Sequence, residues 1–362
     1  MAELTPIINA AGKLTALGGS VQSETVANAV AEAAQQHVDL AEQRQLVAEK
    51  IAQLTGAEAA CITSGAAAGI SISVASILTG TNLDLIHQLP DVDVNNKILL
   101  QAGHAINFGA PITQMIRLGG GRPRLLGSAN HVPEQALTDA LQNEEFAAMV
   151  YVKSHHCVQT NQISLQRCLQ VCHLHNIPLI IDAAAEEDLT RYISAGADLV
   201  TYSGGKAFCG PTSGFIVGRS DLIESCEMQS LGIARTMKVG KETIAGLALA
   251  LDEYVLGSEQ DRLDHYEQLN NQLSTKLASC KHLQSSLMPD EAGRPFSRTA
   301  IRVNRGDIKQ LVSFLKDSTP SIRTRNHHIN DGYLLIDPRE ITRSQVEVIS
   351  QRLLEFDAGL KK

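Results

Sequence analysis

The chain has 362 residues, of which 44% are hydrophobic and 19% charged, and its formal net charge is −8. This length allows more than one domain and a large core. The acidic balance argues against a nucleic-acid partner, which requires a basic face. The 7 cysteines are odd in number and scattered, so we expect reduced thiols and a cytoplasmic protein.

The first elements are a helix and an uncharged segment. Residues 39–56 predict an amphipathic helix that stops at Gly56. Residues 59–83 carry no charge and are long enough to cross a bilayer, but Ser, Thr and Gly interrupt them and no basic cluster flanks them. We therefore expect a short strand followed by a helix buried on all sides, and no membrane association.

Short apolar runs continue along the chain and predict further strands. A helical pattern, "QISLQRCLQVCHLHN", lies among them and leads into Pro178. Fully apolar strands separated by helices indicate an α/β fold with a mostly parallel sheet covered on both faces. The runs are "KILLQ", "AAMVYVK", "PLIIDAA", "ADLVTYS" and "FIVGR".

The character of the sequence changes near residue 245. Two long helical patterns are followed by alternating strand and helix patterns, including "TAIRVN", "IKQLVSFLKD" and "DGYLLID". We expect a large domain over residues 1–243, with the N-terminal segment included, and a smaller α+β domain over residues 244–362.

Three features converge on the carboxyl ends of the predicted parallel strands, where open α/β sheets bind ligands. Ser64, Gly65 and Ala66 stand where a strand turns into a helix, and the free N–H groups there suit a phosphate. Asp182 ends a buried strand and needs a cationic partner. Lys206 follows the next strand.

A phosphate cradle, a buried aspartate and a lysine together suggest pyridoxal 5'-phosphate. Lys206 would form the Schiff base, and Asp182 would pair with the protonated pyridine nitrogen. Ser203 would add a hydroxyl to the phosphate site, and Gly204 and Gly205 would let the cofactor approach the backbone. From the residues alone, a solvated loop lysine and a helix-capping aspartate remain the alternative.

Two histidine- and cysteine-containing stretches resemble metal sites without matching one. In "CLQVCHLH", Leu169 and Cys172 follow a helical apolar face, which favours core packing. The pairs in "SHHC" and "NHHI" lack further ligands. We assign no metal.

Five segments together resemble the pyridoxal-phosphate enzymes of the selenocysteine-synthase-like group. They are "INAAGKLTALGGS", "TGAEAACITSGAAAGI", "IPLIIDAAAEEDL", "LVTYSGGKAFCGPTSGFIVGR" and "IARTMKVGKE". The resemblance runs from about residue 7 to at least residue 250. It implies the aspartate-aminotransferase type of fold (fold type I) and a homo-oligomer whose active sites lie at subunit interfaces.

The resemblance also implies roles for individual residues. Lys206 matches the Schiff-base lysine and Asp182 the partner of the pyridine nitrogen, while Ser64, Gly65 and Ala66 match the phosphate loop. His104 occupies the position from which a ring usually stacks over the cofactor. The alternative is that it is an ordinary polar residue at a strand end. A tRNA substrate fits poorly, because the chain is acidic and its catalytic core begins almost at Met1.

The implied reaction is a lyase reaction that removes water and ammonia from an amino sugar acid phosphate, leaving a 2-keto-3-deoxy acid. Lys206 would remove the α-proton, and Lys206 or His104 would act as the acid. Arg339, Arg235 and Lys238 are the candidate contacts for the small anionic substrate, with Arg339 favoured for its carboxylate. An aldolase, a sulfur or selenium transfer, a transamination, and a non-catalytic binding protein are the alternatives.

Overall fold

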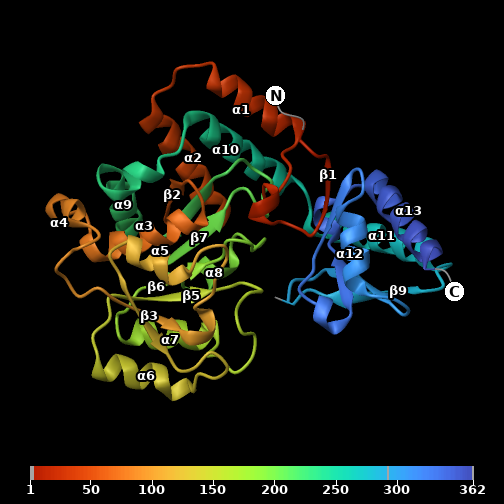
Figure 1. The fold of residues 1–362 in the computed structure, drawn as a ribbon. Coiled ribbons are helices and arrows are strands. Elements are labelled where there is room, and N and C mark those ends of the chain that lie inside the picture. Colours follow the sequence, from red (N-terminus) through yellow and green to blue (C-terminus); the bar gives the residue numbers. More distant parts are fainter. Residues whose placement is uncertain (1–3, 292, 361–362) are drawn as a thin grey trace. The chain divides into compact units, whose positions relative to one another are not determined.

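The computed structural model describes residues 4–291 and 293–360 (Figure 1). The chain forms two compact units. One is Gln22–Asp252, and the other joins the residues up to Val21 with those from Glu253 onward. The sequence placed a boundary between residues 243 and 244 and kept the N-terminal segment with the large domain. The units differ from this division, because strand β1 near the N-terminus pairs with a strand of the C-terminal part.

The unit Gln22–Asp252 contains a seven-stranded sheet in the order β2-β8-β7-β6-β5-β3-β4. The strands from β7 to β4 in this order run parallel, whereas β8 is antiparallel to both of its neighbours. The prediction of a mostly parallel α/β sheet is therefore confirmed. The strands are β2 (Ala59–Thr63), β3 (Lys97–Gln101), β4 (Arg122–Leu126), β5 (Ala148–Val152), β6 (Leu179–Asp182), β7 (Leu199–Ser203) and β8 (Gly214–Gly218).

Ten α-helices begin in this unit, and they start and stop at recognisable residues. Helix α2 is capped by Asp39, whose carboxylate accepts the N–H groups of Ala41 and Glu42, and by Gly56, which lies in the left-handed region. The helix expected there is thus confirmed. The helices are α1 (Glu24–Ala34), α2 (Leu40–Thr55), α3 (Ala66–Thr79), α4 (Leu83–Gln88), α5 (Ile112–Leu118), α6 (Glu134–Asn143), α7 (Leu165–Leu174), α8 (Arg191–Ser194), α9 (Ser220–Met228) and α10 (Lys241–Leu256).

Helix α3 is the central helix of this unit. It packs against β6, β7 and β8 and against helices α5 and α9, so that most of its side chains are buried. The uncharged segment 59–83 therefore consists mainly of strand β2 and a buried helix, as the sequence indicated. In the part of the chain that the structure describes, no helix is both long and apolar enough to cross a bilayer.

Gly69 sets how closely α3 approaches the sheet. A Cβ atom at this position would lie 2.0 Å from Oγ1 and 3.0 Å from Cβ of Thr201, which is fully buried on β7. Any side chain larger than hydrogen would push the helix away from the strand that ends at Ser203.

We expect Gly69→Ala to lower the free energy of unfolding by about 1–3 kcal/mol, because overpacking displaces α3 from β7. Gly359→Ala is the matched control: it also lies in a helix, and a Cβ there meets no atom within 4 Å. Urea unfolding of the two variants measures the difference. A Gly69→Ala protein as stable as the control would contradict the close approach.

The other unit is an α+β arrangement. Strands β12 (Tyr333–Ile336), β10 (Ser297–Val303) and β9 (Leu283–Pro289) form an antiparallel sheet in that order. Strand β1 (Ile7–Ala10) pairs in parallel with β11 (Ser321–Thr324). Helices α11 (Glu259–Leu277), α12 (Ile308–Lys316) and α13 (Arg343–Gly359) complete the unit and share one apolar core with these strands.

Candidate active site

The carboxyl ends of β2 and β7 lie on either side of β8. Thr63 of β2 and Ser203 of β7 both pair with Gly214. A Cβ atom on Gly214 would lie 2.6 Å from the carbonyl oxygen of Tyr202 and 2.7 Å from the carbonyl carbon of Gly65. The residues that follow β2 therefore lie directly beside the end of β7.

The N-terminus of α3 is suited to an anion. Gly65 is the N-cap residue, no side chain caps the helix, and its first turn carries no acidic residue. A Cβ on Gly65 would meet nothing within 4 Å among the described residues, so the space beside this N-cap residue is open. Ser64 and Gly65 are half-buried. A phosphate would find unpaired donors and the positive end of the helix dipole here.

Asp182 ends β6, one strand away from β7, and pairs with Thr201. Its side chain is buried, and its Oδ1 accepts the Ala184 N–H at 3.1 Å. Burial raises the pKa of this carboxyl to about 6, and the nearby charge of Glu186 adds to the rise, while the charge of Lys206 and the Ala184 N–H oppose it. Because burial and Glu186 outweigh Lys206 and the Ala184 N–H, one more cation beside this carboxyl would stabilise its charged form.

Lys206 lies in the turn that follows β7 and is half-buried. Backbone hydrogen bonds hold the turn, among them Gly204 N–H to Ser213 O (2.8 Å) and Gly210 N–H to Gly204 O (2.9 Å). A Cβ on Gly204 would lie 2.2 Å from Oγ of Ser213. The protein's own packing thus requires this glycine, which the sequence analysis had explained by the approach of a cofactor.

His104 ends a 3-10 turn, Ala102–His104, that follows β3. Its ring is buried edge-on against Tyr151, with ring centroids 4.6 Å apart, and Nδ1 accepts the Val152 N–H at 3.2 Å. Burial, together with the charge of Lys153, lowers the pKa of His104 to about 4. The imidazole is therefore neutral near pH 7, and the hydrogen bond assigns its proton to Nε2.

Two charged residues at this edge were missed by the sequence analysis. Lys153 directly follows β5, and Glu186 is buried beside Asp182, where its Oε2 accepts the hydroxyl of Tyr192 at 2.6 Å. The signal for Lys153 was present in "AAMVYVK", because it is a charged residue at the end of a fully apolar run, as Asp182 is.

The candidate substrate residues Arg235 and Lys238 lie outside this cluster of strand ends. Both are exposed on the segment that follows α9: Arg235 belongs to a 3-10 helix (Ile233–Met237), and Lys238 follows it. Their predicted contact with a substrate stays a prediction.

Arg339 belongs to the other unit, in a short 3-10 turn after β12. Its Nε and Nη2 donate to the two carboxylate oxygens of Asp337, each at 2.9 Å, and its guanidinium lies over the ring of Phe296. Asp337 also accepts Nε of the buried Arg298 at 2.7 Å. A substrate carboxylate at Arg339 would have to use its remaining N–H groups, because Asp337 already engages two of them.

The other histidine and cysteine clusters give no metal site. Cys168 and Cys172 are buried on α7, which confirms core packing for that helix. Among the described residues, no group of three His, Cys, Asp or Glu side chains is placed to hold a metal ion.

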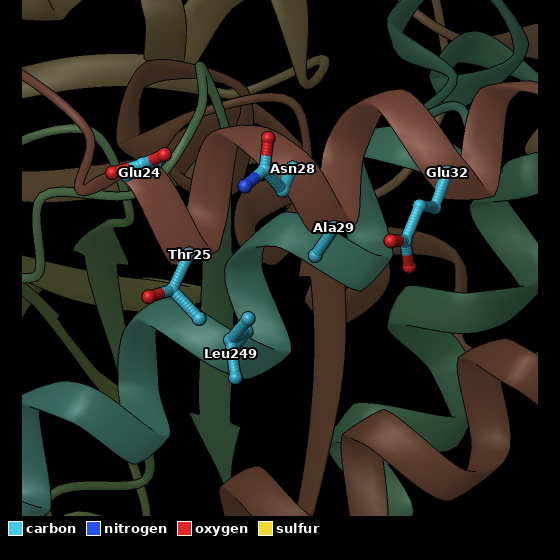
Figure 2. Close-up of a pocket in the computed structure, with 6 residues that line it drawn as sticks. All are labelled: Glu24, Thr25, Asn28, Ala29, Glu32 and Leu249. Carbon is cyan, nitrogen blue, oxygen red and sulfur yellow. The ribbon is translucent and has the colours of Figure 1, made fainter.

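A separate pocket lies between α1 and α10 (Figure 2). Figure 2 shows Leu249 of α10 below the residues of α1 that line it, which include Glu24 and Glu32. The pocket shares no residue with the strand ends, and its two carboxylates make it unsuited to an anionic ligand.

The fold and the strand-end site define the class: the chain is an α/β protein of fold type I. It superimposes on the cysteine desulfurase of Escherichia coli with a TM-score of 0.57 at 16% identity, over 94% of this chain and 93% of that one, which shows the fold alone. A structure of D-glucosaminate-6-phosphate ammonia-lyase matches with a TM-score of 0.91 at 38% identity, over 99% of this chain and 97% of that one.

The sequence comparisons give the family. A family model described as "SelA: L-seryl-tRNA selenium transferase" matches residues 124–307. The D-glucosaminate-6-phosphate ammonia lyase of Salmonella typhimurium is 39% identical over 98% of this chain and 96% of its own length. The 5'-C-glycyluridine monooxygenase-decarboxylase of a Streptomyces species is 38% identical over 98% of this chain and 90% of its own length. The chain belongs to the SelA family, as the quoted segments indicated.

Proposed function

We propose that the protein is a pyridoxal-phosphate-dependent ammonia-lyase that converts D-glucosaminate 6-phosphate into 2-keto-3-deoxy-gluconate 6-phosphate and ammonia. The observation that carries the proposal is the similarity to the Salmonella ammonia lyase, which extends over 98% of this chain and 96% of that enzyme. The site supports the class of cofactor, and this similarity supports the substrate.

The strand-end residues fit the cofactor. The uncapped N-terminus of α3 at Ser64, Gly65 and Ala66 would hold its phosphate. Asp182, which is buried and lacks a full balancing charge, would hold the proton on the pyridine nitrogen, and Ser203 lies at the adjoining strand end. Lys206 would hold the cofactor covalently through its ε-amine.

When bound, pyridoxal phosphate supplies an electron sink that stabilises negative charge at the substrate α-carbon. Nζ of Lys206 would take the α-proton, for which it must be neutral. The half-buried position of Lys206 and the positive charge of a protonated cofactor beside it would favour the neutral amine. The net reaction loses one water from C2 and C3 and takes one up again as ammonia leaves, so the product is the 3-deoxy 2-keto acid.

The proton for the leaving 3-hydroxyl is assigned to Lys206 rather than His104. His104 is neutral near pH 7 because its pKa is lowered to about 4, and its Nδ1 is occupied by the Val152 N–H. A neutral imidazole N–H is a weak acid, whereas Lys206 carries the proton that it has just removed. His104 would instead orient the bound ring from its fixed position against Tyr151.

The proposal includes a small anionic substrate, a cytoplasmic location and a homo-oligomer. A net charge of −8 gives no general attraction to tRNA. All of the cysteines are free thiols, which supports a reducing compartment. The homo-oligomer rests on the resemblance to the family.

A second candidate function has nearly equal sequence support. The relative named 5'-C-glycyluridine monooxygenase-decarboxylase is 38% identical over 98% of this chain. By its name, its reaction consumes oxygen and releases carbon dioxide, so it differs from an elimination in both reactants and products.

The test is an assay of the purified protein with added pyridoxal phosphate. We expect D-glucosaminate 6-phosphate to yield equal amounts of keto acid and ammonia, at the same rate with and without oxygen. The control substrate is 5'-C-glycyluridine, with oxygen uptake and carbon dioxide measured. No ammonia from any amino sugar acid, or turnover that requires oxygen, would refute the lyase.

A further inference from the structure

Lys153 is a second lysine at the edge of the sheet where Asp182 and Lys206 lie. It directly follows β5, whose last residue, Val152, pairs with Asp182. The Lys153 N–H donates to the carbonyl oxygen of Asp182 at 2.9 Å. The backbone of Lys153 is therefore held against that of the buried aspartate, in the layer of strand ends that forms the candidate site.

The charge of Lys153 acts on the interior of this site. Burial lowers the pKa of the His104 imidazole and the charge of Lys153 adds to this fall, whereas burial and the charge of Asp182 raise the pKa of the Cys157 thiol and Lys153 partly opposes that rise. His104 comes from the turn after β3, and Cys157 from the loop after β5. The ammonium of the half-buried Lys153 thus lies within electrostatic reach of groups from separate elements around the strand ends.

No protein carboxylate balances this charge in the part of the chain that the structure describes. Other lysines have acidic partners: Lys97 pairs with Glu144 at 3.1 Å and Lys276 with Glu347 at 2.6 Å. A half-buried ammonium at the strand ends, with no protein carboxylate paired to it, is available to an anionic ligand as a point charge. Here the proposed ligand is an amino sugar acid with a carboxylate and a phosphate.

We propose that Lys153 binds an oxyanion of the substrate, its carboxylate or its phosphate, at the strand ends that carry Asp182 and His104. The identity of the substrate rests on the proposed function, whereas the effect on His104 does not. Lysine suits this role as a point charge that meets an oxyanion without requiring a bidentate geometry.

The first experiment compares Lys153→Met and Lys153→Arg with the control Lys97→Met, which removes the same charge from an exposed pair at the start of β3. We expect Lys153→Met to raise KM for D-glucosaminate 6-phosphate about 10- to 100-fold, with a smaller change in kcat, since a charged hydrogen bond is lost. Lys153→Arg should keep most of the affinity. Unchanged KM in Lys153→Met would overturn the binding role.

Unphosphorylated D-glucosaminate identifies the oxyanion. If Lys153 meets the carboxylate, Lys153→Met raises KM for both substrates by similar factors. If it meets the phosphate, the loss is confined to the phosphorylated substrate. Either pattern supports the binding role.

The second experiment needs no activity. In the apoprotein, NMR titration of labelled histidine follows His104, assigned with His104→Gln. The ring contacts Tyr151 and the Val152 N–H, and the charged group that acts on it is Lys153. We expect Lys153→Met, but not Lys97→Met, to raise the pKa of His104. An unchanged titration would overturn the placement of the Lys153 ammonium near His104, on which the binding role depends.

The two proposals fail in different ways. If the wild-type protein turns over no amino sugar acid, the lyase function fails, and inorganic phosphate then serves as the probe for the apoprotein. Phosphate that shifts the His104 signals in the wild type but not in Lys153→Met supports the oxyanion site. Equal shifts in both proteins would overturn it.

Discussion

Lys206→Ala will lower the turnover of the amino sugar acid phosphate by at least about 10³-fold, because one amine serves as cofactor attachment, base and acid. The fold should persist, since Lys206 is half-buried in a turn held by the hydrogen bonds of Gly204 and Gly210. Activity is measured as ammonia release. Attachment is measured by borohydride reduction with pyridoxal phosphate, followed by peptide mapping.

Two controls accompany this variant. Lys206→Arg keeps the charge but lacks the amine that can attach the cofactor, and it should be as inactive as Lys206→Ala. Lys97→Ala removes an exposed lysine of the same unit and should keep full activity. Reduced cofactor found on another lysine of the wild-type protein, with none on Lys206, would remove the basis of the proposed function.

Asp182→Asn will abolish activity yet leave the apoprotein more stable at neutral pH. Burial raises the pKa of Asp182 from 3.8 to about 6, so the folded apoprotein holds a costly charge above that pH. An amide of the same size removes the charge. It cannot hold a proton on the pyridine nitrogen, so the electron sink is lost.

The stability gain has a defined pH window. Between pH 3.8 and about 6 the folded state binds more protons at Asp182 than the unfolded state does, so the wild-type stability from this group falls as the pH rises. The advantage of Asp182→Asn should therefore be absent at pH 3.8 and grow to on the order of 2–3 kcal/mol by pH 7. Urea unfolding of the two apoproteins across this range checks it. A gain that shrinks with rising pH would be inconsistent with a buried carboxylate.

The strands of the large sheet were predictable where burial dictates the sequence. The apolar runs "KILLQ" and "PLIIDAA" became β3 and β6, because strands covered on both faces admit almost no polar side chain. Strand β4, Arg122–Leu126, was missed for the converse reason: it lies at the sheet edge, is largely exposed, and contains two arginines and a proline.

The helix α2 shows the limit of a periodic pattern. Its bounds and both caps were predictable from Asp39 and Gly56, but two of its apolar residues, Leu40 and Leu46, are 44% and 59% exposed. The side chains that pack are Val47 and Ile51. Spacing predicts a helix, but how much of its apolar face a neighbour covers depends on the tertiary structure.

The candidate site was predicted from polar residues that end an apolar run or follow it closely, as Asp182 and Lys206 do. The neutral state of His104 was not, because the lowered pKa depends on how deeply the ring is buried and then on the charge of Lys153 from a different strand end. The ion pair between Arg339 and Asp337 could not be predicted either. The two residues are close in sequence, but their contact depends on the geometry of a turn.

The pairing of β1 with β11 has a consequence for synthesis on the ribosome. Strand β1 (Ile7–Ala10) leaves the ribosome early, whereas its partner β11 (Ser321–Thr324) is translated only after most of the chain. Through that interval the hydrogen-bonding edge of an apolar strand is open to neighbouring polypeptides, and closing so long a loop carries an entropic cost. Nascent chains stalled before β11 should therefore associate with one another or with chaperones more readily than the finished protein.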